Sequence, residues 1–334
     1  MIAMLGQQPT LLSPFDQRLN KVFENMLQDV VRVISINVTT DNGFVHAVRS
    51  TNPDFLIAGV EIPRVNKSVI NAGKKLKAII CTSMGVDYVD LKAATEKGVF
   101  VTNVPDLAPE AVAEYALGLM FALSRKIVYA HQATTSCNWD RCVEFEGTEL
   151  CGKTLGVLGI GESGRYLALK AKGLGMGVIA YDPLLTADAA CELGIVLVDL
   201  DTLLKVSDIV SIHVPMADYS RKLIGEKQLR AMKKSAFIIN CAQGSAVDER
   251  ALLRALKEKW ICGAALDVLE EEPPNSQLLA LDNVVITPHL AMNTRKAKER
   301  SLRLVREEIV RIIKGEIPEN LVNTDLLEQE NPYP

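Results

Sequence analysis

The stretch TLGVLGIGESGRYLALKAKGLGMGVIAYD, residues 154–182, decides the expected fold. Its first five residues, Thr154–Leu158, predict a buried strand that runs directly into the glycine motif GIGESG at 159–164. Arg165–Leu174 predicts a helix, and Gly177–Tyr181 predicts a second strand. The glycine motif therefore lies between a strand and a helix, which is the setting of a dinucleotide-binding turn.

Each position of this motif has a physical purpose in such a turn. Gly159 permits the tight backbone turn, Gly161 lets the backbone approach a pyrophosphate, and Gly164 lets the helix pack close to the strand. Ile160 lies between the first two glycines and completes the predicted phosphate-binding turn. The helix that follows presents free N–H groups and the positive end of its dipole to phosphates.

Asp182 follows the second strand, 18 residues after Gly164. A carboxylate in that place accepts hydrogen bonds from the adenosine ribose hydroxyls and repels a 2′-phosphate. Residues 183–185 are Pro, Leu and Leu, so no neighbouring cation accommodates that phosphate. The sequence therefore predicts NAD rather than NADP as the cofactor.

Short apolar runs alternate with longer helix-period stretches along the rest of the chain. Leu76–Thr82 and Val99–Asn103 predict strands, whereas Val86–Glu96 and Pro109–Lys126 predict helices. This alternation favours an α/β fold in which crossover helices join parallel strands.

The composition excludes several classes of protein. A length of 334 residues predicts about two domains at ~150 residues each, and the 48% of hydrophobic residues suffices for their cores. Lys and Arg total 37 against 41 Asp and Glu, which is not the basic character of nucleic-acid-binding proteins. No apolar stretch reaches ~18 residues, and the opening MIAMLGQQP lacks the pattern of a signal peptide. We therefore expect a cytoplasmic protein with neither a nucleic-acid nor a membrane partner.

The seven cysteines are scattered, odd in number and free of any Cys-x-x-Cys pair. This pattern favours buried, reduced thiols over disulfides or a structural zinc site. The four histidines are too dispersed to suggest ligands for an ion. No metal is therefore expected.

Polar residues follow three further predicted strands, Ala236–Asn240, Ile261–Leu266 and Val284–Ile286. They are Cys241 and Gln243 after the first, Asp267 and Glu270–Glu272 after the second, and His289 after the third. Ligands of open α/β sheets bind at the carboxyl ends of strands, so these side chains are expected near the nicotinamide. His289 with one of the glutamates forms the usual acid–base device, since a carboxylate favours the protonated imidazole and fixes its tautomer. A solvated acidic turn and a structural histidine are the alternatives.

Taken together, these motifs resemble the D-isomer-specific 2-hydroxyacid dehydrogenases. The matching runs include VLGIGESG with YDP, SIHVP, IINCAQGSAVDERAL, AALDVLEEEPP and ITPHL. Upstream, GVDYVDLKAATEKGVFVTNVP and VAEYALGLM also match, so the resemblance covers roughly Leu76 to Asn323. The C-terminal half is most similar to D-3-phosphoglycerate dehydrogenases. Because the chain ends soon after Asn323, the regulatory domain that follows in many of those enzymes is expected to be absent.

The resemblance implies two Rossmann-like α/β domains with parallel sheets. The substrate domain, flavodoxin-like and discontinuous, is expected at residues 1–104 plus 293–334, and the NAD-binding domain at 105–292. The implied reaction is hydride transfer between NAD(H) and C2 of a small 2-hydroxy or 2-keto acid. A homodimer through the NAD-binding domains is also implied, with the helix Pro109–Lys126 as a candidate interface.

The resemblance also assigns site residues. It implies that His289 and Glu272 form the acid–base pair, that Asp267 holds the nicotinamide carboxamide, and that the backbone around Cys241 lines the nicotinamide ring. His213, in SIHVP, is interpreted as a cofactor-wall or structural residue rather than a catalytic one. Ser83, Met84 and Gly85 fall in the loop for the substrate carboxylate, where Met84 replaces the family's usual glycine.

Gln243 departs from the family pattern, which has an arginine that orients the substrate carboxylate and polarises the ketone. Arginine offers a permanent charge and a bidentate fork, whereas glutamine is neutral and bonds the substrate oxygen only weakly. Losing a charge-assisted contact of this kind typically costs ~10²–10³-fold in rate. Three explanations stay open: an enzyme with a different substrate or a cation from elsewhere, an NAD-binding regulator without turnover, or an inactivated variant. Arg295 is a speculative substitute cation, against the simpler interpretation of a surface arginine.

Overall fold

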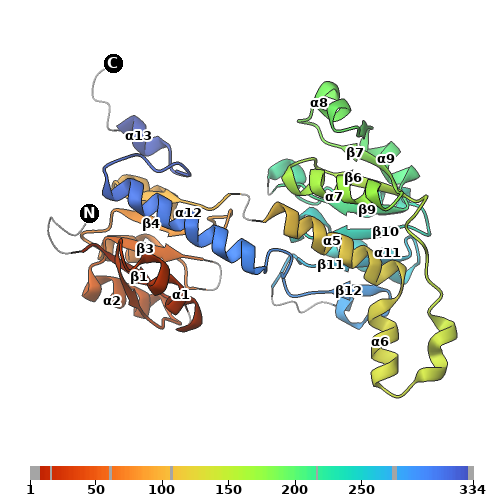
Figure 1. Ribbon diagram of the computed structural model, residues 1–334, viewed down its shortest axis with the longest axis horizontal. Coiled ribbons are helices and arrows are strands. Elements are labelled where there is room, and N and C mark those ends of the chain that lie inside the picture. Colours follow the sequence, from red (N-terminus) through yellow and green to blue (C-terminus); the bar gives the residue numbers. More distant parts are fainter. Residues whose placement is uncertain are drawn as a thin grey trace. The chain divides into compact units, whose positions relative to one another are not determined.

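Both sheets of the protein consist of parallel strands that helices connect (Figure 1). The computed structural model describes residues 8–15, 17–59, 62–105, 108–215, 217–272 and 277–329. The chain divides into two units, a discontinuous unit of residues 1–107 and 295–334 and a central unit of residues 108–294. Within the described residues, no helix is both long and apolar enough to cross a membrane.

The central unit is built on a seven-stranded sheet in the order β12-β11-β10-β9-β6-β7-β8. Counted from β6, this is the order 3-2-1-4-5-6 of the Rossmann fold with a seventh strand at the edge. The sequence order reverses between β6 and β9, so ligands are expected at the carboxyl ends of these two strands. The strands are β6 (Thr154–Leu158), β7 (Gly177–Tyr181), β8 (Val196–Leu197), β9 (Ile209–Ile212), β10 (Phe237–Asn240), β11 (Gly263–Leu266) and β12 (Val284–Ile286).

Helices cover both faces of this sheet. On one face Val157 and Ile239 pack with α5 and α7, and on the other Ile238 packs with α9, α10 and α11. The alternation follows from the two-residue period of a strand. The helices are α5 (Pro109–Ser124), α6 (Ile127–Thr135), α7 (Glu162–Gly173), α8 (Ala187–Glu192), α9 (Leu200–Val206), α10 (Glu226–Ala231) and α11 (Glu249–Lys257). Short 3₁₀ helices are η1 (Trp139–Glu144), η2 (Asp218–Ser220), η3 (Gly244–Ala246) and η4 (Gln277–Ala280).

The discontinuous unit contains a five-stranded sheet in the order β2-β1-β3-β4-β5, which is the flavodoxin-like order. Phe55 and Ile57 point into the core beside α1 and α12, whereas Leu56 and Ala58 point into the core beside α2, α3 and α4. The strands are β1 (Thr10–Ser13), β2 (Arg32–Ser35), β3 (Phe55–Ala58), β4 (Ala78–Cys81) and β5 (Phe100–Thr102). The helices are α1 (Gln17–Leu27), α2 (Asp41–Thr51), α3 (Lys67–Ala72), α4 (Leu91–Glu96), α12 (Arg295–Ile313) and α13 (Asp325–Gln329).

The first residues of two helices differ from the sequence-based expectation. The helix expected from Val86 begins at Leu91, because Val89 instead forms a bridge with Val65 and Asp90 caps the helix by accepting from the Ala93 N–H. In the central unit α7 begins at Glu162, inside the glycine motif rather than after it. In the first case a tertiary contact overrides local helical periodicity, and in the second the helix extends back into the glycine motif, which the periodicity of the apolar residues does not mark.

Candidate active site

The glycine loop after β6 has the geometry that its sequence predicts. Gly159 has a φ of +90°, and a Cβ there would lie 2.7 Å from the carbonyl oxygen of His213. A Cβ on Gly164 would lie 2.2 Å from the carbonyl oxygen of Gly159, so only glycine lets α7 start this close to the strand. Nothing lies within 4 Å of a Cβ position on Gly161, which leaves this backbone open to a ligand.

These residues fit a bound dinucleotide. The first turn of α7 follows Gly161 and has no side-chain cap, so its N–H groups are available to a pyrophosphate. The Asp182 carboxylate accepts hydrogen bonds from the backbone N–H of Ile160 at 2.7 Å and of Leu184 at 2.9 Å. It therefore lies against the glycine loop, where a ribose-binding carboxylate is needed.

His213 lies behind this loop. Its imidazole is buried between two hydroxyls, with Nδ1 3.0 Å from Ser163 Oγ and Nε2 2.9 Å from Ser211 Oγ. Burial lowers the pKa of this imidazole to about 4. A neutral histidine thus joins β9 to the first turn of α7, and its assignment to the cofactor wall stays a prediction.

The burial of His213 predicts that the free energy of unfolding decreases at acidic pH. The pKa of an unfolded histidine is about 6.5, so between pH 6.5 and pH 4 the unfolded chain binds a proton that the folded chain does not. Stability therefore falls as the pH drops through this window. Between pH 7.5 and pH 5, the unfolding free energy of the wild type is expected to fall by about 2 kcal/mol more than that of His213→Asn. Urea denaturation at the two pH values measures this, and equal losses would contradict it.

The loops after β10 and β11 are in direct contact. A Cβ on Gly244 would lie 1.9 Å from the carbonyl oxygen of Leu269, so glycine is required where the loops meet. Asn240, at the end of β10, donates to the carbonyl oxygen of Gln243 at 2.8 Å and accepts from the N–H of Ala242 at 3.0 Å. The backbone of Gln243 is fixed in this way, whereas its half-buried side chain makes no hydrogen bond to the described residues.

Asp267 organises the segment that follows β12. Its carboxylate is 1% exposed and accepts from Thr287 Oγ1 at 2.6 Å and from the N–H groups of Leu290 and Ala291 at 2.9 and 2.7 Å. Its carbonyl oxygen accepts from the His289 N–H at 2.9 Å. Asp267 therefore holds the backbone on both sides of His289, and its contact with the nicotinamide remains a prediction.

Of the three consecutive glutamates, Glu272 is the one in contact with His289. Its Oε2 lies 2.9 Å from His289 Nδ1, and its Oε1 accepts from the N–H of Leu269 at 3.0 Å. Glu270 instead lies 3.5 Å from Lys222. His289 has a φ of +55°, an uncommon conformation that its double hydrogen bond to the carbonyl oxygens of Asp267 and Thr287 supports.

The cysteines match their expectation only in part. All six whose side chains the structure describes are free, and Cys142 lies outside that set. The expected burial is wrong for Cys137, Cys151 and Cys191, which are exposed because they lie in surface segments outside the strands. Cys241 is buried, and burial raises the pKa of its thiol. Burial therefore disfavours its thiolate form, and its place beside the nicotinamide ring stays a prediction.

Ser83, Met84 and Gly85 form a loop after β4 in the discontinuous unit. Asn103 Nδ2 donates to the Met84 carbonyl oxygen at 2.9 Å, and Ser83 Oγ donates to the Gly85 carbonyl oxygen at 3.0 Å. The Met84 side chain is 51% exposed. Arg295 belongs to the same unit, is 92% exposed and pairs with Glu299 at 2.9 Å, as a surface arginine does.

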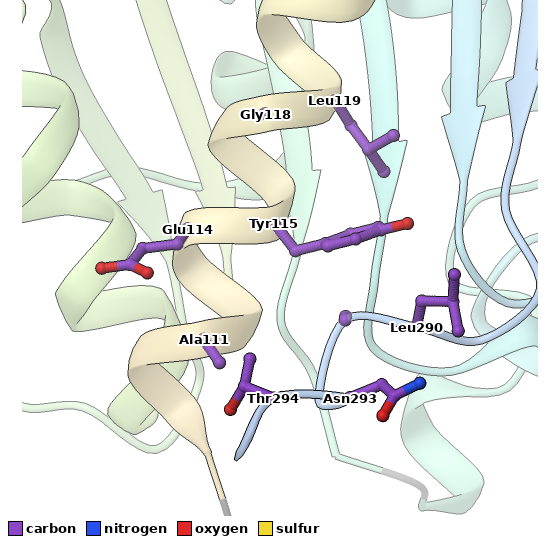
Figure 2. Close-up of a pocket in the computed structure, with 9 residues that line it drawn as sticks. Ala111, Glu114, Tyr115, Gly118, Leu119, Leu290, Asn293 and Thr294 are labelled. Atoms are coloured by element: carbon purple, nitrogen blue, oxygen red, sulfur yellow. The ribbon is translucent and has the colours of Figure 1, made fainter. Parts of the chain in front are cut away.

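A groove in the central unit runs between α5 and the segment after His289. Figure 2 shows Tyr115 of α5 on the side that faces Leu290 and Asn293, whereas Glu114 points away. Glu114 instead pairs with Lys170 of α7 at 3.1 Å. The lining includes none of the predicted catalytic residues, so this groove is separate from the acid–base pair.

The comparisons with known proteins now identify the family. The model of the D-isomer specific 2-hydroxyacid dehydrogenase, NAD binding domain, matches residues 117–291, which lie inside the central unit. The chain belongs to the D-isomer specific 2-hydroxyacid dehydrogenase family. This confirms the resemblance, the two-sheet α/β fold and NAD as the cofactor, and it makes the protein an NAD-dependent dehydrogenase-like enzyme.

Individual relatives agree with the family. The D-3-phosphoglycerate dehydrogenase of Methanocaldococcus jannaschii is 45% identical over 269 residues, which are 80% of this chain and 51% of that protein. This chain thus spans about half the length of that relative. The glyoxylate reductase of Thermococcus litoralis is 42% identical over 276 residues, covering 80% of this chain and 83% of that protein. The structure of D-lactate dehydrogenase from Aquifex aeolicus complexed with NAD and lactic acid has a TM-score of 0.79 and 28% identity, covering 94% and 99% of the two chains.

Several residues that shape the site were missed from the sequence. Asn240 and Gly244 fix the loop of Gln243, Thr287 bonds Asp267, and Tyr88 lies 2.8 Å from Ser83. Gly244 gave a usable signal, because a glycine directly after a strand indicates a close backbone approach. Tyr88 gave none, since the helix expected from Val86 placed it in the wrong element.

Proposed function

We propose that the protein reduces small 2-keto acids and oxidises the corresponding 2-hydroxy acids, with His289 as the acid–base group and Glu272 as its partner. NAD(H), when bound, donates or accepts the hydride at C2 of the substrate. The observation that carries this proposal is the 2.9 Å contact between His289 Nδ1 and Glu272 Oε2. A protein that only binds NAD has no physical need for such a pair.

In reduction, protonated His289 gives its Nε2 proton to the ketone oxygen as that oxygen gains negative charge. Glu272 stabilises the imidazolium and keeps Nδ1 protonated, while the Leu269 N–H holds the carboxylate in place. Asp267 fixes the backbone around His289 through four hydrogen bonds. In oxidation the same imidazole, then neutral, removes the hydroxyl proton.

We propose that the Ser83–Gly85 loop binds the substrate carboxylate. The Ser83–Gly85 loop carries the assigned residues, and its carbonyl oxygens are bonded within the unit. Met84 is larger than the family's glycine, so we expect it to restrict the size of the group on C3. Gln243 donates a neutral hydrogen bond to the substrate oxygen.

The direct test is NADH oxidation against a panel of 2-keto acids that includes glyoxylate, hydroxypyruvate, phosphohydroxypyruvate and a bulkier keto acid. Turnover of at least one of them, faster with NADH than with NADPH, is the expected result. NADH binding without turnover across the panel would overturn the proposal. That outcome would favour an NAD-binding regulator in which the glutamine at 243 has removed activity.

We also propose that two copies associate through α5 of the central unit. This helix is mostly apolar: Val112, Ala116 and Met120 are buried in the core, whereas Leu117 and Phe121 remain partly exposed. Partly exposed apolar side chains on a helix favour contact with a further apolar surface. A second copy of the same helix is the simplest cover, because a twofold interface pairs identical surfaces.

Light scattering is expected to give twice the chain mass of 36.5 kDa. Gly118→Arg is expected to yield a monomer, because a side chain at this exposed position meets nothing within 4 Å in the single chain but places a charge on the proposed interface. Gly173→Arg, at an equally open helical position of α7, serves as the control and stays dimeric. A dimeric Gly118→Arg variant, or a monomeric wild type, would contradict the assignment.

A further inference from the structure

The loop after β4 presents a row of backbone N–H groups. The carbonyl oxygens of Ser83, Met84 and Gly85 accept hydrogen bonds from the Val104 N–H at 3.3 Å, Asn103 Nδ2 at 2.9 Å and Ser83 Oγ at 3.0 Å. In a trans peptide the carbonyl and the next N–H point in opposite directions. Three successive N–H groups, those of residues 84–86, are therefore turned away from these bonds. None of the three has a partner among the described residues.

Free backbone N–H groups bind anions, and their affinity depends on how firmly each peptide plane is held. The plane between Gly85 and Val86 depends on a single side chain, Ser83. The Ser83 hydroxyl has one proton, which it donates to the Gly85 carbonyl oxygen. The 2.8 Å contact between Ser83 Oγ and the Tyr88 hydroxyl must then be donated by Tyr88.

Tyr88 is itself a rigid anchor. Its carbonyl oxygen accepts from the Val65 N–H at 2.8 Å, and the next bond of this bridge runs from the Asp90 N–H to the Val65 carbonyl oxygen at 3.0 Å. Burial raises the pKa of the Tyr88 hydroxyl, so this group keeps its proton at physiological pH. Tyr88 therefore has a proton to donate to Ser83 Oγ, and Ser83 donates its own proton to the Gly85 carbonyl oxygen.

We propose that Tyr88 is a positioning residue for the substrate: through Ser83 it fixes the Gly85–Val86 peptide so that the Val86 N–H stays directed at the substrate carboxylate. This inference rests on the proposed function, because it takes the substrate to be a 2-keto acid whose carboxylate binds this loop. Tyr88 touches neither the substrate nor the reacting atoms. Its effect falls on carboxylate affinity and not on the proton-transfer step.

The test compares Tyr88→Phe with the wild type in steady-state reduction of the best keto acid. Losing one neutral hydrogen bond weakens binding about threefold to tenfold, so KM is expected to rise by that factor while kcat stays within about twofold. A second readout needs no turnover: the Kd of oxamate, an unreactive carboxylate analogue of a 2-keto acid, for the protein–NADH complex, followed by NADH fluorescence. This Kd is expected to rise by the same factor, whereas the Kd of NADH stays unchanged.

A double-mutant cycle with Ser83→Ala tests whether the two residues act as one chain. Each single variant and the double variant are expected to raise the oxamate Kd by similar factors, because the second change removes nothing further. Tyr219→Phe, which removes an exposed hydroxyl in the central unit, is the control and leaves KM unchanged. If Tyr88→Phe folds poorly, Ser83→Ala alone still breaks the bond to Gly85 and gives the same shift.

The outcomes separate this inference from the function it rests on. A wild type that binds oxamate without reducing any keto acid would overturn the proposed reaction, and a weaker oxamate Kd in Tyr88→Phe would still support the positioning role. A wild type with turnover, whose KM and oxamate Kd are unchanged by Tyr88→Phe and Ser83→Ala, would overturn the inference alone. Failure of the wild-type complex to bind oxamate would also overturn it.

Discussion

Replacing His289 with asparagine is expected to lower kcat for 2-keto acid reduction by about 10²–10⁴ and to leave the Kd of NADH unchanged. The variant removes the only proton donor that we assign to the ketone oxygen. Asparagine is chosen because the backbone at position 289 has a φ of +55°, which asparagine tolerates better than alanine does. The hydrogen bonds from the 289 N–H to Asp267 and Thr287 are therefore kept. Steady-state kinetics and NADH fluorescence titration measure the two quantities.

Glu272→Gln tests the second member of the acid–base pair. Its oxygen can keep the bond from the Leu269 N–H, which directs the NH₂ group at His289 Nδ1 and disfavours the imidazolium. We expect a loss of kcat in the same direction as for His289→Asn, and little further loss in the double variant, because the two side chains act as a unit. A His289→Asn variant with at least half the wild-type kcat would refute the assignment of the acid–base group.

Replacing Gln243 with arginine is expected to raise kcat/KM for small 2-keto acids by about 10²–10³. Arginine supplies a charged, bidentate donor to the substrate carboxylate and to the developing negative charge on the ketone oxygen. The local structure accepts the change: the Gln243 backbone is extended, with φ −138° and ψ 128°, and its side chain bonds none of the described residues. Asn240 holds only the Gln243 carbonyl oxygen, which the substitution keeps.

Gln132→Arg, at an exposed position of α6, controls for an added positive charge elsewhere on the central unit. It is expected to leave kcat/KM unchanged. A gain restricted to Gln243→Arg would establish that the wild-type glutamine limits the rate with ordinary keto acids. An unchanged or lower kcat/KM in Gln243→Arg would instead indicate that the natural substrate needs a neutral group at this position.

The glycine loop was predictable from the sequence because its backbone requirements involve only residues close together in the chain. Gly159 needs a positive φ, Gly164 needs room for a helix against a strand, and both demands leave a spaced pattern of glycines. The short apolar strands and the α/β class were readable for a similar reason, since a strand buried on both faces is apolar along its whole length. Asp182 follows from the same reasoning, because it ends the strand next to the loop it bonds.

Contacts between distant segments were decided only by the tertiary structure. Spacing alone offered three glutamates as partners of His289, and the family resemblance implied Glu272. The structure shows how Glu272 makes the contact, because the Leu269 N–H holds its carboxylate toward the imidazole. Likewise, Val86–Asp90 has helical periodicity, yet the bridge between Val65 and Val89 pulls it into a loop and brings Tyr88 to Ser83.

The same division holds for the site as a whole. The sequence determined which reactive residue types are present and that they lie at the ends of strands. This is because each strand and turn requires particular residue types at its own positions. The sequence did not determine which of those side chains pair with one another. A hydrogen bond between two different segments leaves no periodicity in either of them. Packing of Gly244 against Leu269 and burial of Asp267 beneath His289 fix that pairing, and both exist only in the folded chain.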